Sequence, residues 1–223
     1  MKTIIAFLVL ILSLQSTGCT VQKTVTDPAL VNLQQNKAAI VTYYDTGKYE
    51  EEIKSIATEA ENYINRILKS GRYNKPAIIF DIDDTLLNNY PFYQRTGFRF
   101  SSSTWKQWVN IGEIPSIKAM HGLFLTYVDK IDVFIITGRS VFQRAQTIRN
   151  LKSQGYDGWK NIFFKEEWDR GLSAKQYKYR ILKQIVEKDK YQFIANFGDQ
   201  ESDFAYPING RNFKLPNYLY ITK

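Results

Sequence analysis

Aspartates 81 and 83 stand directly after a run of apolar residues, 76–80, that is typical of a buried strand. Side chains two positions apart on an extended segment point the same way, so the carboxylates of Asp81 and Asp83 should project together. Two such carboxylates repel one another unless a cation lies between them, and oxygen ligands favour a divalent metal such as Mg²⁺. The alternative is a strand that ends in a solvated acidic turn, which a short Asp-x-Asp motif alone does not exclude.

Two further apolar runs end in residues that bind phosphate or metal ions. The run 132–136 is followed by a hydroxyl, a glycine and a guanidinium, all of them phosphate-binding groups: Thr137, Gly138 and Arg139. The run 192–197 leads into a glycine and then into two more acids, Asp199 and Asp203. The sequence therefore places acidic and anion-binding groups after three separate strand-like runs.

Strand-like and helical patterns alternate along the chain, which predicts an α/β fold with a Rossmann-like parallel sheet flanked by helices. The ends of the strands then lie along one edge, where ligands of such sheets bind, and the acids can converge there. The expected strands are 76–81, 132–137, 161–164 and 192–197, with a possible edge strand at Leu219–Ile221. The expected helices are a segment from Pro28 onward, an amphipathic helix from Lys48 closed by Gly71, and the segments 117–127, 141–153 and 174–187.

Residues 88–118 are too long and too rich in aromatic side chains for a plain connection between core elements. We expect a small, mainly helical cap. Its rings form either the cap's own core or a wall that stacks on a substrate ring. These rings are Tyr90, Phe92, Tyr93, Phe98, Phe100, Trp105 and Trp108.

Composition excludes several kinds of chemistry. The 223 residues include one cysteine and one histidine, so the chain has neither an intrachain disulfide nor a histidine-based phosphatase centre, and His121 is interpreted as structural. The net charge of +8 favours anionic ligands, but the basic residues are dispersed among acids. A small anionic substrate therefore fits better than nucleic acid, which is not an expected partner.

Residues 1–18 have a basic start, an apolar run and small residues, the pattern of a secretory signal peptide. The small residues before Cys19 resemble a bacterial lipobox, so residues 19–45 are predicted to be a lipidated tether with an N-terminal helical segment. Lipid on Cys19 would anchor an exported protein to a membrane without spanning it. By resemblance to sorted lipoproteins, Thr20 favours the outer membrane, facing the periplasm. The alternative is ordinary signal cleavage without lipidation.

Four motifs in this order resemble the haloacid-dehalogenase-like superfamily: Asp81-x-Asp83-x-Thr85, Thr137, a lysine, and Gly198-Asp199-x-x-x-Asp203. Within it, the chain is similar to the class B and plant-type acid phosphatase family. That closer similarity lies in the segments 80–87, 89–93, 105–115, 136–139, 155–159, 177–178, 198–200 and 211–217. The resemblance implies a phosphatase domain at 46–223 with its cap inserted at about 88–118.

The resemblance also implies roles for single residues. Asp81 would be the nucleophile that forms an aspartyl-phosphate, and Asp83 would be the general acid and base. Mg²⁺ would bind the Asp81 carboxylate, the Asp83 backbone carbonyl and Asp199, and we add Asp203 to this predicted metal site. The predicted phosphate-binding residues are Thr137, Gly138, Arg139 and Lys178, the last chosen over Lys175 because the family has the Tyr177-Lys178 pair.

These assignments predict a magnesium-dependent acid phosphatase that hydrolyses phosphate monoesters, with nucleoside monophosphates or aryl phosphates as the expected substrates. Some relatives in this family are storage proteins that lack the nucleophile, whereas Asp81 is present here. Two alternatives remain open on the sequence. One is a ligand-binding surface lipoprotein whose acids only hold an ion, and the other is a nucleic-acid end phosphatase.

Overall fold

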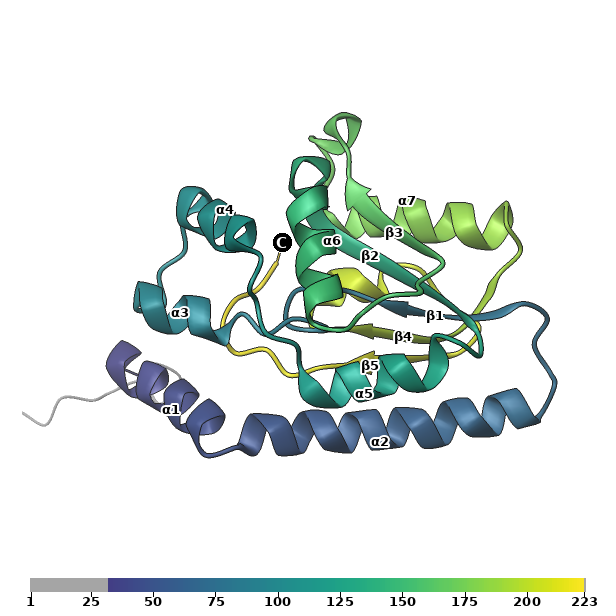
Figure 1. The fold of residues 1–223 in the computed structure, drawn as a ribbon, viewed down its shortest axis with the longest axis horizontal. Helices are drawn as coiled ribbons and strands as arrows, with labels where there is room; N and C mark the ends of the chain where they lie inside the picture. Colours follow the sequence, from purple (N-terminus) through teal and green to yellow (C-terminus); the bar gives the residue numbers. More distant parts are fainter. Residues whose placement is uncertain (1–31, 223) are drawn as a thin grey trace, which may run out of the picture.

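Five parallel strands form the central sheet of the computed structural model, which describes residues 32–222 (Figure 1). The strand order is β3-β2-β1-β4-β5, so β1 lies in the middle. The strands are β1 (Pro76–Phe80), β2 (Asp132–Ser140), β3 (Asn161–Lys165), β4 (Gln192–Gly198) and β5 (Arg211–Lys214). The predicted α/β class with a parallel sheet is confirmed, and all strands end at one edge.

The prediction of an edge strand at Leu219–Ile221 is wrong. The edge strand on that side is β5, which begins at Arg211 and pairs with β4. Downstream of Pro216 the backbone N–H groups bond to side chains instead of a strand: Leu219 N donates to Asn217 Oδ1 at 2.7 Å, and Thr222 N donates to Gln200 Oε1 at 2.8 Å. The C-terminal tail is therefore tied to the residues that follow β4.

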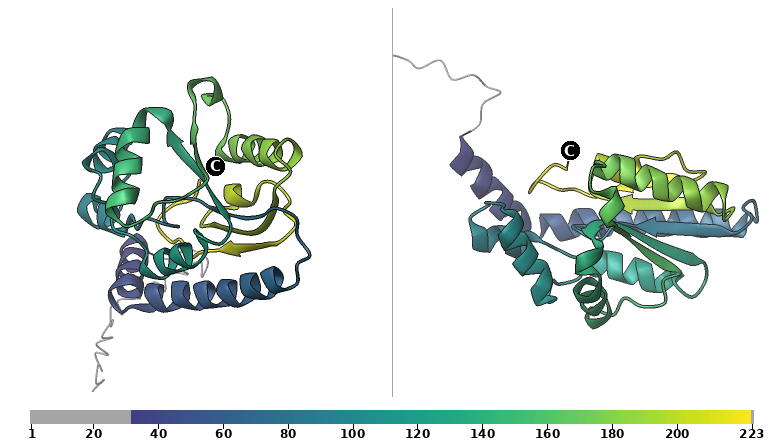
Figure 2. Two further views of the ribbon diagram at one scale, coloured as in Figure 1. Left: turned by 45° about the vertical axis from the view of Figure 1, so that its right-hand side comes forward. Right: turned by 90° about the horizontal axis from the view of Figure 1, so that it is seen from above.

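Two helical layers cover the sheet, and strand alternation decides which side chains meet each layer (Figure 2). Ile78 and Phe80 of β1 belong to the same buried cluster as residues of α2, α5 and α6, whereas Ala77 and Ile79 pack with α7. The described helices are α1 (Leu33–Asp45), α2 (Lys48–Lys69), α3 (Tyr90–Thr96), α4 (Ser102–Ile111), α5 (Lys118–Tyr127), α6 (Arg144–Ser153) and α7 (Ala174–Glu187).

Helix α2 shows how the pattern of apolar residues produces this layer. Its buried residues recur every three or four positions and form one apolar stripe: Tyr49, Ile53, Ala57, Ala60 and Ile64. The helix ends at Lys69, and Gly71 follows with φ of 59°, a left-handed conformation that glycine adopts at little cost. The prediction of a helix from Lys48 closed by Gly71 is confirmed.

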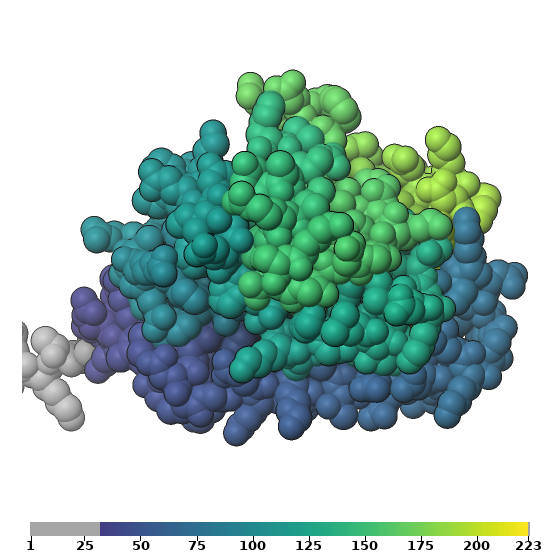
Figure 3. Space-filling model, in the orientation of Figure 1, coloured from purple at the N-terminus to yellow at the C-terminus, as the bar shows by residue number. Residues whose placement is uncertain are grey.

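The segment between β1 and α5 contains the two short helices α3 and α4, as expected for a mainly helical cap. In the space-filling view it forms one continuous surface with α1 (Figure 3). The ring of Tyr44 in α1 stacks on Tyr90 at the start of α3, with centroids 4.0 Å apart and planes 6° apart. The division of the chain into domains at 45 and 46 stays a prediction.

Within residues 32–222, no helix combines the length and the apolar composition needed to cross a bilayer. The predicted signal peptide at 1–18 and the predicted lipid site at Cys19 lie outside the described residues.

Candidate active site

A cavity of about 830 Å³ lies at the carboxyl edge of the sheet. Four acids predicted from the sequence line it: Asp81, Asp83, Asp199 and Asp203. They come from the ends of β1 and β4 and from the 3₁₀ turn Glu201–Phe204 that follows β4. The convergence expected from the parallel sheet is therefore present.

Lys178 is the cation at the centre of this group. Its ammonium contacts Asp81 Oδ1 and Asp203 Oδ1, each at 2.5 Å, and its side chain is 6% exposed. Burial disfavours the charged lysine, but the carboxylates of Asp203 and Asp81 raise its pKa above the ordinary value. Lys178 is therefore held as a cation beside the predicted nucleophile.

Asp199 is fixed by two amides. Gln200 Nε2 donates to its Oδ2 at 2.5 Å and Asn217 Nδ2 donates to the same oxygen at 2.6 Å. Burial, together with the nearby carboxylates of Asp203 and Asp84, raises the pKa of Asp199 to about 7. Within the described residues, its Oδ1 receives no hydrogen bond.

The donor set fits a hard divalent cation. Asp81, Asp199 and Asp203 each place a carboxylate oxygen within 4.8 Å of the others, and all three are buried. Burial also raises the pKa of Asp81 well above its ordinary value, despite the opposing effect of Lys178. Three buried carboxylates beside one lysine leave negative charge uncompensated. An ion that prefers oxygen ligands, such as Mg²⁺, would neutralise this charge.

Asp203 also has a positioning function. Its Oδ1 holds Lys178, and its Oδ2 accepts the Gln200 backbone N–H at 2.8 Å. Both carboxylate oxygens thus already have partners inside the protein. The predicted contact between Asp203 and metal stays a prediction, but the structure shows that Asp203 anchors the lysine.

Gly198 lets Asp203 take this place. A Cβ atom at position 198 would lie 2.2 Å from Asp203 Oδ2 and 2.4 Å from Asp203 Cβ, far inside van der Waals contact. The backbone at the end of β4 therefore has to approach the Asp203 side chain without a side chain of its own. This explains physically why a glycine precedes Asp199 in the motif.

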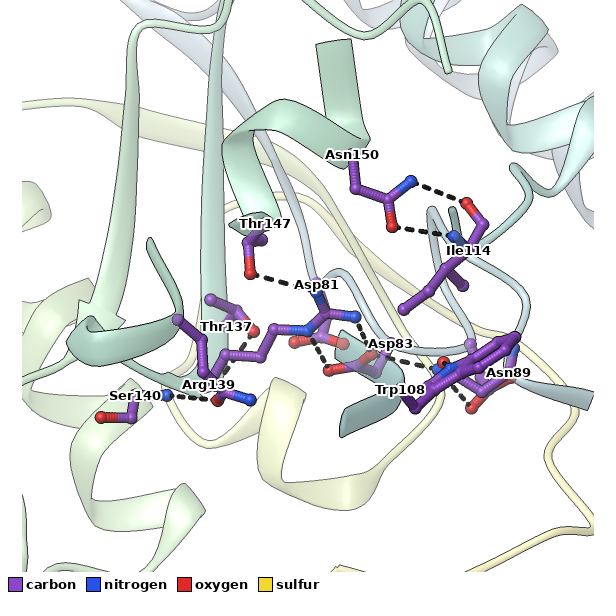
Figure 4. Close-up of polar contacts among 12 residues, drawn as sticks. Asp81, Asp83, Asn89, Trp108, Ile114, Thr137, Arg139, Ser140, Thr147 and Asn150 are labelled. Carbon is purple, nitrogen blue, oxygen red and sulfur yellow. Dashed lines mark hydrogen bonds and ion pairs between the residues drawn. The ribbon is translucent and has the colours of Figure 1, made fainter. Parts of the chain in front are cut away.

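Asp83 lies in a separate polar network (Figure 4). Arg139 Nε and Nη2 donate to its two carboxylate oxygens at 3.0 and 2.6 Å, forming a bidentate pair. Asn89 Nδ2 donates to Asp83 Oδ1 at 3.0 Å. The orientation of the Asp83 carboxylate is therefore fixed from both sides.

This network reaches into the cap and into α6. Asn89 Oδ1 accepts the indole N–H of Trp108 at 3.0 Å, and Arg139 Nη1 donates to Thr147 Oγ1 at 3.1 Å. The sequence interpretation gave no role to Asn89 and considered Trp108 only as one of the cap's aromatic rings. Both residues lie in segments that resemble the acid phosphatase family, and this resemblance could have marked them as part of the site. It did not show that they contact one another.

Asp84 was also missed as part of the site. It is buried, and its backbone has φ of 53°, the left-handed conformation that turns the chain sharply after Asp83. Its oxygens accept the Asn89 backbone N–H at 3.0 Å and the Asn89 side-chain amide at 3.2 Å. Burial raises the pKa of Asp84 to about 7, against the lowering effect of these bonds to Asn89.

The predicted phosphate-binding residues differ in position. Gly138 and Arg139 line the cavity with Lys178, whereas Thr137 is fully buried and its Oγ1 accepts the Arg139 backbone N–H at 3.1 Å. Lys175 is exposed on the first turn of α7, so the geometry favours Lys178. Arg139 is engaged with Asp83, and its role in binding phosphate stays a prediction.

The aromatic side chains of the cap divide into two groups. Tyr90, Phe92 and Trp108 are buried and belong to the main hydrophobic cluster. Four others line the cavity: Tyr93, Phe98, Phe100 and Trp105. Tyr220 from the C-terminal tail lines it too and lies parallel to Tyr93, with centroids 5.9 Å apart. Some rings of the cap therefore form part of its core and others line the cavity, and a stacking role for the latter stays a prediction.

Comparison with known proteins decides the family. Residues 8–223 match the sequence profile of the family described as "HAD superfamily, subfamily IIIB (Acid phosphatase)". The chain belongs to this acid phosphatase family. It is 32% identical over 177 residues to Acid phosphatase 1 of Solanum lycopersicum, which covers 77% of this chain and 69% of that protein.

Other relatives of this subfamily IIIB chain include storage proteins. It is 32% identical over 191 residues to Vegetative storage protein 1 of Arabidopsis thaliana, covering 82% of this chain and 69% of the relative. The class C acid phosphatase from Bacillus anthracis has the same fold, with a TM-score of 0.69 and 21% identity over 84% of this chain and 85% of that one. The predicted acid phosphatase family and α/β fold are confirmed.

Membership in the acid phosphatase family makes the chain a phosphomonoester hydrolase that acts on a small phosphate ester. The alternative of a lipoprotein that only binds a ligand is set aside on this ground.

Replacing Gly198 with alanine should displace Asp203 and, with it, Lys178. Because misplacing a catalytic group by about 1 Å can cost about a hundredfold in rate, we expect kcat/KM for an aryl phosphate to fall by roughly 10- to 100-fold. Steady-state kinetics beside circular dichroism would measure this. Gly122→Ala in α5 is the matched control, because a Cβ there meets nothing within 4 Å. Equal activity in both variants would show that the close approach at Gly198 is unimportant.

Proposed function

We propose that the chain is a magnesium-dependent acid phosphatase that hydrolyses small phosphomonoesters through a phosphorylated Asp81. The observation that carries this proposal is the arrangement around Asp81, at the bottom of a cavity that also contains Lys178 and Asp199. Lys178 engages Asp81 Oδ1, while within the described residues Asp81 Oδ2 receives no hydrogen bond. One carboxylate oxygen is therefore available to attack phosphorus.

In the first half of the proposed reaction, an oxygen of Asp81 forms a bond to phosphorus as the bond from phosphorus to the leaving oxygen breaks. The Asp83 carboxyl gives its proton to that leaving oxygen. Because Arg139 and Asn89 hold both oxygens of Asp83, proton transfer needs one of these bonds to open. Lys178 and the Gly138 amide bind the phosphoryl oxygens as charge shifts onto them.

In the second half, Asp83 takes a proton from a water molecule, whose oxygen attacks phosphorus. The bond between phosphorus and Asp81 then breaks, which releases inorganic phosphate and restores the carboxylate. Held by Asp81, Asp199 and, by family resemblance, the Asp83 backbone carbonyl, Mg²⁺ would offset the repulsion between the nucleophile and the phosphate.

We further propose an aromatic preference for the substrate. The cavity is far larger than a phosphate group, and one wall consists of cap rings, of which Trp105 is half-buried and Phe100 is 59% exposed. Flat rings such as nucleobases and aryl groups stack favourably on such side chains. This supports nucleoside monophosphates and aryl phosphates as substrates, and a small molecule rather than a nucleic-acid end.

The cellular setting is also proposed. The apolar run Ile4–Leu14 and the small residues before Cys19 support export, lipidation of Cys19 and anchoring of the protein to a membrane. Thr20 supports the outer membrane, with the enzyme facing the periplasm, and the catalytic unit would then act close to the bilayer.

The metal requirement predicts loss of activity on chelation and recovery with Mg²⁺, measured on a soluble form that starts after Cys19. Stability gives a second readout. The pKa of Asp199 is raised to about 7 from an ordinary value of about 3.9, so its contribution to stability without metal is complete below about pH 4 and is lost as pH rises through 7. Mg²⁺ should therefore raise the Tm more at pH 8 than at pH 5. Full activity in protein proven metal-free would refute the requirement.

Replacing each of the two aspartates of the first motif, Asp81 and Asp83, should reduce activity in a different way. Asp81→Asn removes the attacking oxygen and should abolish turnover. Asp83→Asn removes the proton donor, so activity should fall at least about tenfold more on an alkyl phosphate than on a nitrophenyl phosphate, whose leaving group needs little protonation. Steady-state kcat on both substrates gives the comparison. Equal losses on the two substrates would argue against acid catalysis by Asp83.

The aromatic wall predicts selective losses from Phe100→Leu and Trp105→Leu. Because one stacking contact contributes about 1 kcal/mol, kcat/KM for a nucleoside monophosphate should fall several-fold while that for a sugar phosphate changes little. Phe142→Leu is the control, since Phe142 is 68% exposed and lies outside the cavity lining. If the variants only lower the Tm and keep the preference, the rings serve the core of the cap instead.

Lipidation predicts that the full-length protein partitions into detergent and that Cys19→Ala moves it to the aqueous phase. Mass spectrometry of the native amino terminus would identify the attached chains. An unmodified terminus on protein isolated from membranes would refute the anchor without affecting the proposed chemistry.

A further inference from the structure

Lys165, the last residue of β3, lines the cavity on the side of the sheet's β3 edge. Its ammonium donates one hydrogen bond, to the backbone carbonyl of Leu172, which also lines the cavity. A lysine ammonium has three N–H donors, so two remain for a ligand. The phosphatase chemistry described above gives this residue no task.

Lys165 differs in its charge balance from the other cations of the cavity. Arg139 is paired with Asp83, and Lys178 with Asp81 and Asp203. Among the described residues, no carboxylate lies within ion-pair distance of Lys165. Of the cationic side chains that the structure places in the cavity wall, it alone keeps an uncompensated charge.

The acids nearest to Lys165 in sequence are held by other residues. Glu166 Oε1 accepts from Arg144 at 3.1 Å. Both oxygens of Asp169 accept from Arg180, at 2.7 and 2.9 Å. Two of the three carboxylates in the loop that follows β3 are thus paired with arginines, and the third, Glu167, is exposed and forms no ion pair with Lys165 in the part of the chain that the structure describes.

The sheet separates Lys165 from the site of phosphorus attack. Asp81 follows β1, and β2 lies between β1 and β3, so Lys165 and Asp81 are separated across the sheet by two strand spacings, or about 10 Å. Lys165 pairs in register with Ser140, past the level of Asp81 along the strand direction. An anion bound to Lys165 is therefore a different group from the phosphate bound at Asp81.

We propose that Lys165 forms a second anion subsite, which selects phosphomonoesters that carry another negative group, carboxylate or phosphate, at least about 10 Å from the scissile phosphorus. This inference rests on the proposed phosphatase function, since it assumes that the cleaved phosphate lies at Asp81. It adds a specificity-determining residue at the end of β3.

Matched biphenyl phosphates test the subsite, because each has one cleavable phosphate and a substituent on the far ring that is either carboxylate or neutral carboxamide. A charge-assisted hydrogen bond to Lys165 should lower the KM of the wild-type enzyme about tenfold for the carboxylate compound and leave kcat nearly equal. Equal KM values for the two compounds would overturn the proposal.

Three variants assign the effect to one side chain. Lys165→Gln keeps a donor for the Leu172 carbonyl but removes the charge, so the carboxylate preference should disappear while the KM of the carboxamide compound stays unchanged. Lys165→Arg should retain the preference. Lys175→Gln removes an exposed lysine of α7 outside the cavity lining and should leave the preference intact. A preference that persists in Lys165→Gln would overturn the assignment.

Equilibrium binding separates this inference from the proposed function. Calorimetry on the Asp81→Asn variant, which should not turn over substrate, is expected to show about tenfold tighter binding of the carboxylate compound, and no difference once Lys165→Gln is added. An inactive wild-type enzyme would refute the phosphatase proposal, whereas equal binding of the two compounds to Asp81→Asn would refute the subsite.

Discussion

Repulsion among carboxylates at one edge of the sheet is the constraint that shapes this structure. Strands β1 and β4 and the turn after β4 bring Asp81, Asp199 and Asp203 within 4.8 Å of one another. Buried charges at this distance interact strongly, so the cluster requires cations or protons. The pKa values of Asp81 and Asp199 are raised for the same reason, because a bound proton removes one of the buried negative charges.

Lys178 connects that electrostatic requirement to the packing of the fold. The lysine is on α7, and this helix is held against the sheet by Tyr177, Ile181 and Leu182, which pack with Ala77 and Ile79 of β1. The apolar face of α7 thus positions a cation at the end of the strand whose next residue is Asp81. A change in the packing of α7 against β1 would therefore also disturb the charge balance at the end of this strand.

The features that could be predicted from the sequence are those that depend on the local pattern of residues. A buried strand that ends in acids, repeated along a parallel sheet, is sufficient to predict that Asp81, Asp199 and Asp203 converge. It was not sufficient to find the partner of Arg139, because an arginine after a strand fits a phosphate or a carboxylate equally well by type. The bond between Asn89 and Trp108 and the turn at Asp84 depend on tertiary contacts that have no periodic signal.

The C-terminal tail and the cap show the same limit in different ways. Leu219–Ile221 has the composition of a strand, but Asn217 Oδ1 accepts the backbone N–H groups of Leu219 and Tyr220, so side-chain bonding overrides propensity. In the cap, composition left a core and a stacking wall as alternatives, and the structure shows that some of the rings are buried in the core while others line the cavity.

The contact of α1 with the cap has a practical consequence for anyone who shortens the chain. Tyr44 stacks on Tyr90 of the cap, and the neighbouring Tyr43 lies edge-on against Tyr218 of the tail, with centroids 5.0 Å apart. Helix α1 thus packs against both the cap and the C-terminal tail, two segments that also contribute residues to the cavity lining. A trimmed protein for crystallisation or assay should begin ahead of Leu33, because a start within α1 would expose the rings of the cap and the tail that pack against this helix and alter the enzyme being studied.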